Sequence, residues 1–208
     1  MKISRYLGVA ALFGALGLAA PASATVVLTF EGLGNIAPID DFYNGGAGGN
    51  LGIHFGPDSL AVIEASAGGT GNFSNPPSGV TVAFFLSGPG DVMDIAAGFN
   101  TGFSFFYADQ VGFTGSVSVY SGLDGTGTLL AQLSLPSTPN PYTVFVPVGV
   151  TFAGTAESAV FSGAANFIAF DNVTLGSANP GGSVPEPMTL SLLGIGLAGL
   201  GALRRKRA

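Results

Sequence analysis

The 208-residue sequence contains no cysteine and no tryptophan, and only 9% of its residues are charged. Without cysteine, the chain cannot form a disulfide scaffold, a thiolate metal site or a cysteine nucleophile. Disorder requires low hydrophobicity and high charge, whereas 47% of these residues are hydrophobic. The 34 glycines and 13 prolines favour turns, and the many Val and Phe residues favour strands. The composition therefore indicates a folded β domain.

Positive charge is absent from the whole centre of the chain. All six cations lie near the two ends, and no Lys or Arg occurs from Thr25 to Ser183. The same stretch contains eleven acidic residues, namely Glu31, Asp40, Asp41, Asp58, Glu64, Asp91, Asp94, Asp109, Asp124, Glu157 and Asp171. A region without cations cannot neutralise phosphates, so we expect no nucleic-acid partner. Its carboxylates must be solvated, bonded to backbone N–H groups or ligated to a cation.

The N-terminus has the three parts of a secretory signal peptide in the usual order. A positive segment is followed by an apolar run, Tyr6–Ala20. Ala22 and Ala24 then form an A-x-A cleavage site for a signal peptidase. We therefore predict a signal helix within residues 1–24 that is removed on export, so that the mature chain begins at Thr25.

A second apolar segment, Met188–Leu203, runs for sixteen residues without a charge. We predict that it forms a transmembrane helix, slightly short of the ~30 Å hydrocarbon core and extended by its flanking residues. A basic tail follows, and the positive-inside rule keeps it cytoplasmic: Arg204, Arg205, Lys206 and Arg207. A Gly/Pro/Ser-rich linker over residues 176–183 would separate this helix from the preceding domain. Both ends of the precursor stay inside, and the cation-free middle is exported.

Four residues directly before the apolar segment carry a specific motif: Val184, Pro185, Glu186 and Pro187. With the apolar segment and the basic tail, they make residues 184–208 resemble the PEP-CTERM sorting signal. The resemblance implies recognition by a membrane transpeptidase of the exosortase type, which would cut near the motif and release or transfer the domain to the cell surface. It also implies a Gram-negative envelope and an exopolysaccharide setting. The motif residues would then be recognised as substrate and would not be catalytic.

The pattern of residues 25–175 indicates an all-β domain. Alternating or short apolar runs are bounded by Gly, Pro, Asn and Asp, and no convincing helix of ten residues occurs. We expect about ten strands: Val26–Glu31, Leu51–Phe55, Leu60–Glu64, Val80–Leu86, Phe103–Tyr107, Ser116–Ser121, Leu129–Leu135, Tyr142–Val148, Ala159–Ser162 and Phe167–Leu175. Two packed antiparallel sheets bury such one-sided strands. We therefore predict a jelly-roll-like sandwich, because the number of strands is high for an immunoglobulin-like one.

Residues that could perform catalysis are sparse in this domain. The single histidine, His54, lies on an expected strand, and no nucleophile-elbow motif accompanies it. Asp40 and Asp41 are sequence neighbours, so on a strand their side chains would face opposite ways. Asp91 and Asp94 lie beside a Gly-Pro-Gly turn and are expected to be solvated in a loop. We therefore predict no catalytic residues and no enzymatic activity.

Calcium is the metal that this composition favours, because it binds six to eight oxygens, whereas one His without Cys disfavours zinc. Glu31 ends the first expected strand and Asp171 lies in the last, and these strands commonly pair in a jelly roll. Phe30–Glu31 and Phe170–Val173 resemble the terminal strands of carbohydrate-binding-like jelly rolls, and the resemblance implies that these acids hold a structural calcium. Alternatively, both acids accept hydrogen bonds from backbone N–H groups of turns.

These observations predict an exported surface or extracellular-matrix protein with a structural or interaction role, made as an inner-membrane-anchored precursor. One alternative is a carbohydrate-binding module that attaches to exopolysaccharide. Sugar binding needs exposed aromatic platforms, and without Trp the candidates are Tyr43, Tyr107, Tyr120 and Tyr142. A second alternative is a secreted hydrolase, which would need two carboxylates about 5–10 Å apart in a cleft.

Overall fold

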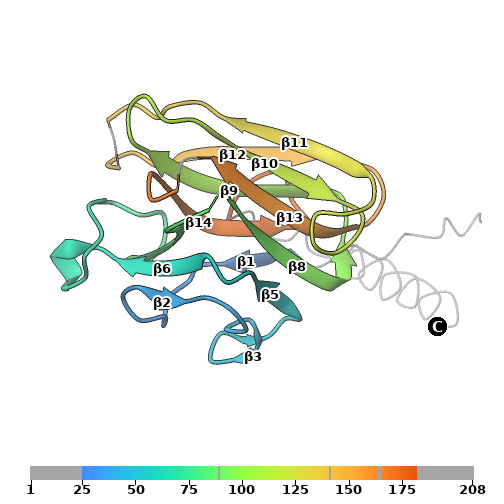
Figure 1. Cartoon of the computed structure of the whole chain (residues 1–208), viewed down its shortest axis with the longest axis horizontal. Helices are drawn as coiled ribbons and strands as arrows, with labels where there is room; N and C mark the ends of the chain where they lie inside the picture. The colour runs from blue at the N-terminus through green and yellow to red at the C-terminus, as the bar shows by residue number, and fades with distance from the viewer. Residues whose placement is uncertain (1–24, 89, 141, 164, 182–208) are drawn as a thin grey trace, which may run out of the picture.

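The described part of the chain contains fourteen β-strands joined by turns and loops, and almost no helix (Figure 1). The computed structural model describes residues 25–88, 90–140, 142–163 and 165–181. Within these ranges the only helical element is a short 3-10 turn, η1 (Ala65–Ala67). It lies in the teal loop at the left end of the molecule in Figure 1. Across the same ranges, no helix has both the length and the apolar character needed to span a membrane.

The larger sheet has seven strands, all paired antiparallel. Its order is β12-β9-β14-β7-β6-β2, and β1 pairs with β14 beside this path. The bounds are β1 (Val26–Leu28), β2 (Ala37–Pro38), β6 (Ser59–Ile63), β7 (Thr81–Phe85), β9 (Gly102–Asp109), β12 (Val146–Thr151) and β14 (Ile168–Leu175).

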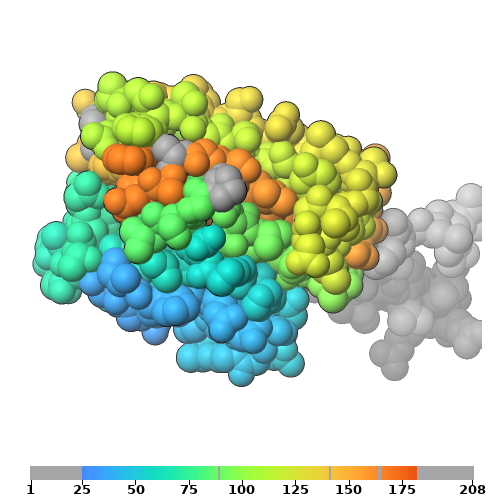
Figure 2. Space-filling model, in the orientation of Figure 1, coloured from blue at the N-terminus to red at the C-terminus, as the bar shows by residue number. Residues whose placement is uncertain are grey.

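The smaller sheet has five strands in the order β11-β10-β13-β8-β5. The bounds are β5 (Ile53–Phe55), β8 (Gly90–Phe99), β10 (Gly115–Tyr120), β11 (Leu129–Leu135) and β13 (Ala156–Gly163). A separate two-stranded hairpin of β3 (Asn44–Gly46) and β4 (Gly49–Asn50) lies between β2 and β5 in the chain. In the space-filling view, this first part of the chain forms the blue and cyan lower flank of the molecule (Figure 2).

Phenylalanine rings pack the two sheets face to face. Phe161 of β13 lies 6.3 and 6.0 Å, between ring centroids, from Phe103 and Phe105 of β9. It also lies 4.9 Å from Phe170 of β14, and all four rings are buried. Each buried ring contributes about 1.5–3 kcal/mol to stability. The sheets therefore form the two-layer antiparallel sandwich that the sequence predicts, with its core between them.

The pairing of the first and last strands is also as predicted. β1 runs antiparallel to β14, with Val26 opposite Leu175 and Leu28 opposite Val173. On its other side, β14 shifts register against β9 between Asp171 and Thr174. This β-bulge adds one residue to β14, and such irregularities re-aim the side chains around them.

The longest strand, β8, was not expected from the sequence. Asp91 and Asp94 lie on this strand and not in a solvated loop. Asp91 is opposite Phe161 on β13, while Asp94 is opposite His54 on β5. The prediction was wrong because Gly and Asp locally favour turns, whereas pairing with a strand on each side overrides that preference.

The chain after β14 remains on the sandwich as far as Gly181, and we call residues Gly176–Gly181 the strap. Thr101 Oγ1 and Ser104 Oγ donate hydrogen bonds to strap carbonyls at 2.7 and 2.9 Å. Thr174 Oγ1 accepts one from a strap amide at 3.0 Å. Within residues 176–183, where the sequence predicts a linker, Gly176, Ser177 and Gly181 are thus hydrogen-bonded to the sandwich.

Candidate functional site

A second hydrophobic cluster covers the outer face of the larger sheet. Because side chains alternate along a strand, the neighbours of core-facing residues point to this other face. The cluster consists of Val62, Phe73, Val82, Phe84, Ala108, Tyr142 and Ala169. Two loops fold over it, since Ser74 in the loop after β6 donates its N–H to the carbonyl of Tyr142 at 2.8 Å.

A cavity of about 160 Å³ opens between these loops and the sheet. Its lining includes three aromatic residues and three polar ones, namely Phe73, Phe84, Tyr142, Thr70, Asn72 and Asn166. No Asp, Glu, Lys, Arg or His lines the cavity within the described residues. Burial, with a smaller effect of Asp109, raises the pKa of Tyr142 to about 12, so its hydroxyl stays protonated. An uncharged pocket that is partly aromatic suits a neutral ligand.

Only one of the four tyrosines expected as sugar platforms lines this cavity, and it is Tyr142. The hydroxyl of Tyr43 accepts a hydrogen bond from the N–H of Phe30 at 2.7 Å. That of Tyr107 donates to the carbonyl of Pro136 at 2.8 Å. Both rings are buried in the main core, so these two tyrosines have structural roles.

Glu31 and Asp171 meet at one turn, directly before β7. Oε1 of Glu31 accepts hydrogen bonds from the N–H groups of Val80 and Thr81 at 2.9 and 2.7 Å. Asp171 accepts from the N–H and the hydroxyl of Ser78 at 2.9 and 3.0 Å. The two acids thus accept the backbone hydrogen bonds that the alternative to a calcium site predicts.

The acid pair combines deep burial with nearby negative charge. Asp171 has 0% of its surface exposed, and burial raises its pKa to about 7, with a smaller contribution from Glu31. Hydrogen bonds from Ser78 and Asn172 act in the opposite direction. Oδ1 of Asn172 is buried without a hydrogen-bond partner. Carboxylate and amide oxygens such as those of Glu31, Asp171 and Asn172 are of the kind that Ca²⁺ prefers.

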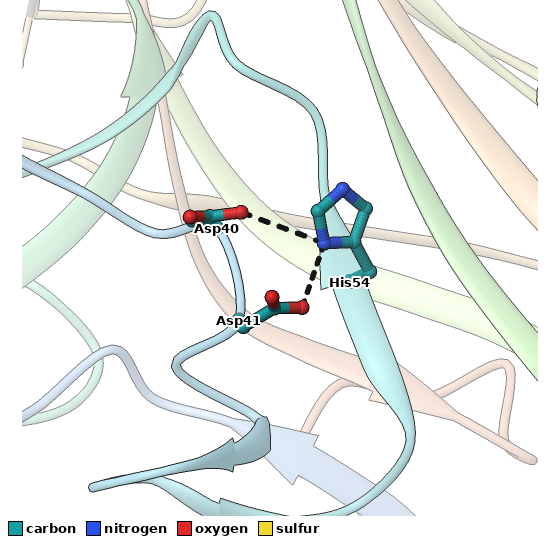
Figure 3. A group of neighbouring side chains, drawn as sticks. All are labelled: Asp40, Asp41 and His54. Carbon is teal, nitrogen blue, oxygen red and sulfur yellow. Dashed lines mark hydrogen bonds and ion pairs between the residues drawn. The ribbon is translucent and has the colours of Figure 1, made fainter.

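A second acidic group lies on the surface around His54 (Figure 3). Nδ1 of His54 is 2.9 Å from Oδ1 of Asp41 and 3.6 Å from Oδ1 of Asp40. These side chains are 44%, 58% and 65% exposed, in that order. The nitrogen and the two oxygens lie within 4.8 Å of one another, which suits an exposed ion pair and is also compatible with a shared divalent cation.

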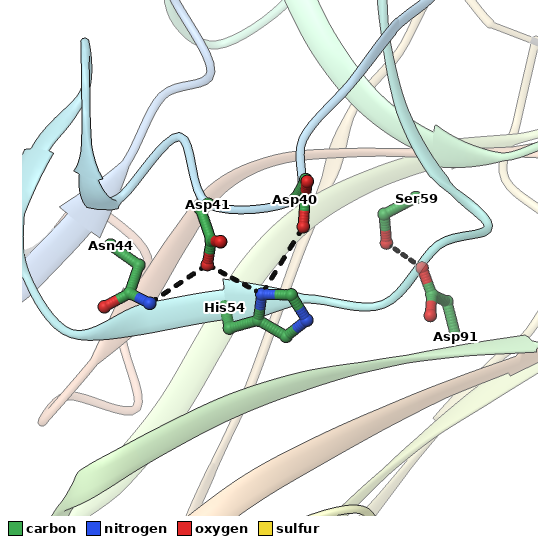
Figure 4. A network of polar contacts seen from close by, with 6 residues as sticks. All are labelled: Asp40, Asp41, Asn44, His54, Ser59 and Asp91. Carbon is green, nitrogen blue, oxygen red and sulfur yellow. Dashed lines mark hydrogen bonds and ion pairs between the residues drawn. The ribbon is translucent and has the colours of Figure 1, made fainter.

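Hydrogen bonds from two side chains set the acidity of Asp41 (Figure 4). Asn44 Nδ2 lies 3.0 Å from the same Oδ1 that His54 contacts. The hydrogen bond from Asn44, and then that from His54, lower the pKa of Asp41. In the same view, Asp91 accepts a hydrogen bond from Ser59 Oγ, and burial raises the pKa of Asp91.

The sequence analysis did not anticipate the group around His54. Asp40 and Asp41 lie in a turn and not on a strand, so they do not alternate faces, and Asp40 has a φ of 42°. No spacing rule links these residues to His54, because β5 brings it back beside the turn only in the folded chain. None of the three side chains lines the cavity described above.

The predicted terminal sites lie outside the described residues. They are the signal-peptide cleavage residues Ala22 and Ala24, the motif Val184, Pro185, Glu186 and Pro187, and the basic tail Arg204, Arg205, Lys206 and Arg207. The expected signal helix and transmembrane helix lie there as well. Their assignment therefore depends on sequence comparison.

Residues 183–207 match the family model described as the PEP-CTERM protein-sorting motif. The match confirms the sorting signal that the sequence suggested. The chain thus carries the signal of an exported protein that is anchored in the membrane before it is processed. No curated protein matches the chain as a whole.

Several solved structures of carbohydrate-binding modules are similar to the sandwich. A family 6 carbohydrate-binding module has 17% identity and a TM-score of 0.43, covering 75% of this chain and 98% of the module. A second family 6 module, CsCBM6-3 from Clostridium stercorarium in complex with cellobiose, has 16% identity and a TM-score of 0.40, covering 72% and 90%. The CBM22-1–GH10 modules of a Clostridium thermocellum xylanase have 15% identity and a TM-score of 0.41, covering 72% and 28%.

Proposed function

We propose that this chain is an exported protein whose β-sandwich has a structural or interaction role, without catalysis, at the cell surface or in the extracellular matrix. The observation that carries the proposal is the sorting motif at residues 183–207, which directly follows a domain without Lys or Arg. A signal peptidase would remove residues 1–24. An exosortase-type transpeptidase would then cut near Pro185, Glu186 and Pro187.

The intact mass of the protein recovered from outside the cell tests this proposal. We expect a chain that begins at Thr25 and ends near the motif, so that the apolar segment and basic tail are gone. Any additional mass would identify the group to which the new end is attached. A full-length chain folded in the cytosol would contradict the proposal.

The cavity on the larger sheet supports a more specific role, the binding of a neutral saccharide from an exopolysaccharide. The small exposed parts of Phe73 and Tyr142, which are 6% and 9% exposed, would contact the apolar face of a sugar ring. Asn72 and Asn166 offer amide hydrogen bonds. A neutral ligand is favoured because the eleven acids of the domain would repel a polyanion.

The position of the cavity fits an external ligand. Ile168 and Ala169, at the start of β14, line it, whereas the chain leaves toward the sorting motif after Leu175. At ~3.3 Å per residue, these two ends of β14 are about 23 Å apart. A tethered precursor would therefore hold the cavity at the end of the strand opposite to its anchor.

Calorimetric titration with neutral β-linked oligosaccharides tests this role. We expect Asn72→Ala, which removes an exposed lining amide, to weaken binding about fivefold by loss of hydrogen bonds. Gln132→Ala, on the smaller sheet, should bind like the unmodified protein. Absence of heat with any neutral saccharide contradicts the saccharide proposal, and release of new reducing ends would instead support the secreted hydrolase.

We further propose that Glu31 and Asp171 hold a structural Ca²⁺. The support is the donor set: two carboxylates at one turn, an unpartnered buried amide oxygen on Asn172, and no Lys or Arg in the domain to balance their charge. The ion would supply the missing positive charge, while the two side chains keep binding the turn before β7. Binding of the ion should raise the stability of the folded domain.

A further inference from the structure

The strap passes over two strands of the larger sheet at positions occupied by glycine. Gly102 of β9 and Gly149 of β12 lie beneath Ala178 of the strap. A Cβ added to Gly102 would lie 2.6 Å from the nitrogen of Ala178, and one added to Gly149 would lie 2.0 Å from its oxygen. Neither glycine has a positive φ, so these positions require the absence of a side chain and not an unusual backbone.

Polar contacts hold the strap along its length. In addition to the bonds from Thr101, Ser104 and Thr174, the N–H of Gly176 donates to the carbonyl of Gly102 at 2.9 Å. Inside the strap, Ser177 Oγ accepts from the N–H of Asn179 at 3.0 Å. The strap is therefore a docked part of the domain, and its docking leaves little free chain before the sorting motif.

The docked strap shortens the reach of that motif. Only residues 182–184 separate Gly181 from Pro185, which limits the distance between these two Cα atoms to about 14 Å. If the strap were released, the free chain would start after Leu175 and could span about 35 Å. An enzyme that cuts near Pro185 would need an extended segment, and in the docked state the chain can leave the sandwich only after Gly181.

We propose that strap docking controls access of the sorting enzyme to its cleavage segment, with Gly102 and Gly149 as positioning residues for that reaction. Processing then requires the strap to leave the larger sheet, so the docked form keeps the precursor at the membrane. This inference rests on the proposed cleavage at the motif. Cleavage that needs local opening follows the population of the open form, so weaker docking should speed processing.

The test follows processing of the full-length chain in cells that contain a PEP-CTERM sorting enzyme. Gly102→Ala places its new Cβ against strap backbone atoms and should release the strap. We expect processing about fivefold faster, consistent with the net loss of about one hydrogen bond. Gly34→Ala is the matched control, because its new Cβ would have only an ordinary 3.7 Å contact and processing should not change.

A second variant separates the effect of free chain length on processing from the effect of domain stability. Six Gly/Ser residues inserted between Gly181 and Gly182 lengthen the free chain while the strap remains docked, and they should also speed processing. Hydrogen exchange at strap amides and the melting temperature report docking and folding. Equal or slower processing of the insertion variant, or of Gly102→Ala with a released strap, overturns the strap proposal. No processing of the unmodified chain overturns the proposed cleavage, and the strap proposal with it.

Discussion

Two acidic groups in this domain have no Lys or Arg nearby to balance their charge, and they are stabilised in different ways. Glu31 and Asp171 lie at the turn before β7, with Asp171 fully buried and both carboxylates bonded to backbone N–H groups. Asp40 and Asp41 lie in a surface turn, where water and His54 surround them. Without Lys or Arg nearby, one group depends on backbone dipoles and the other on solvent.

This difference indicates which acids the fold depends on. Removing a buried acceptor such as Asp171 leaves N–H groups without their partner, which costs more than the hydrogen bonds themselves contribute. Removing an exposed acid changes little, because water replaces its contacts and screens its charge.

Asp171→Ala should lower the free energy of unfolding by about 2 kcal/mol, because the N–H groups of Ser78 and Asn172 lose their acceptor. Urea denaturation at neutral pH measures the change. The matched surface variant, Asp41→Ala, should leave the unfolding midpoint nearly unchanged. Equal losses for the two variants would remove the contrast between the groups.

Millimolar Ca²⁺ should raise the melting temperature by about 5 °C, as expected for an ion that binds the folded chain well above its dissociation constant. Glu31→Gln retains an oxygen for the N–H groups of Val80 and Thr81 but loses the charge, so it should abolish the response. Asp41→Asn should retain it. An unchanged melting temperature of the unmodified protein, with chelator and with calcium, removes the calcium proposal.

Asp91 should make stability fall as pH rises. Burial raises its pKa in the folded state, so the unfolded chain loses this proton at a lower pH than the folded one. Its stabilising contribution is complete below its unfolded pKa near 4 and is lost as pH rises through the folded value. Urea midpoints from pH 4 to 7 should therefore decline more in the unmodified protein than in Asp91→Asn. If the urea midpoints of the two proteins declined in parallel with pH, the effect of Asp91 on stability would be disproved.

The smallest effect concerns Asp41. Asn44→Ala should raise the pKa of Asp41 toward its ordinary value, because it removes the largest of the effects that lower it. His54→Ala should raise this pKa by less. The folded-state pKa is depressed, so the contribution of Asp41 to stability is present at neutral pH and lost as pH falls through that value. Carboxyl ¹³C titration by NMR measures the shift, and a greater rise in His54→Ala would reverse the order.

The sequence predicted most of the fold because strand alternation is local information. Phe103, Phe105 and Tyr107 share one face in the sequence pattern, and all three are buried in the core. Strand β8 was not predicted, because Gly and Asp residues locally favour a turn. Only its pairing with β5 and β13 in the folded chain makes this segment a strand. The docking of the strap was not predicted either. Its Gly/Pro/Ser composition does not show that Gly102 and Gly149, elsewhere in the chain, leave space for it.

Of the candidate sites, too, some were predicted from the sequence and others were not. Glu31 and Asp171 were identified from the expected pairing of the first and last strands, and they do meet at one turn. The cavity was not anticipated, because its residues come from strands and loops that are far apart in the chain. The group around His54 was not anticipated, because only the folded chain brings β5 beside the turn that contains Asp40 and Asp41.

The amino-acid sequence alone determined the export and sorting signals, because charge and hydropathy along a linear segment are what membranes and processing enzymes recognise. It also determined the all-β class, since alternation of apolar residues has the period of a strand. Only the tertiary structure decided which acids are buried, where the cavity opens and that the strap docks. Those features depend on contacts between residues tens of positions apart, and no local pattern records such contacts.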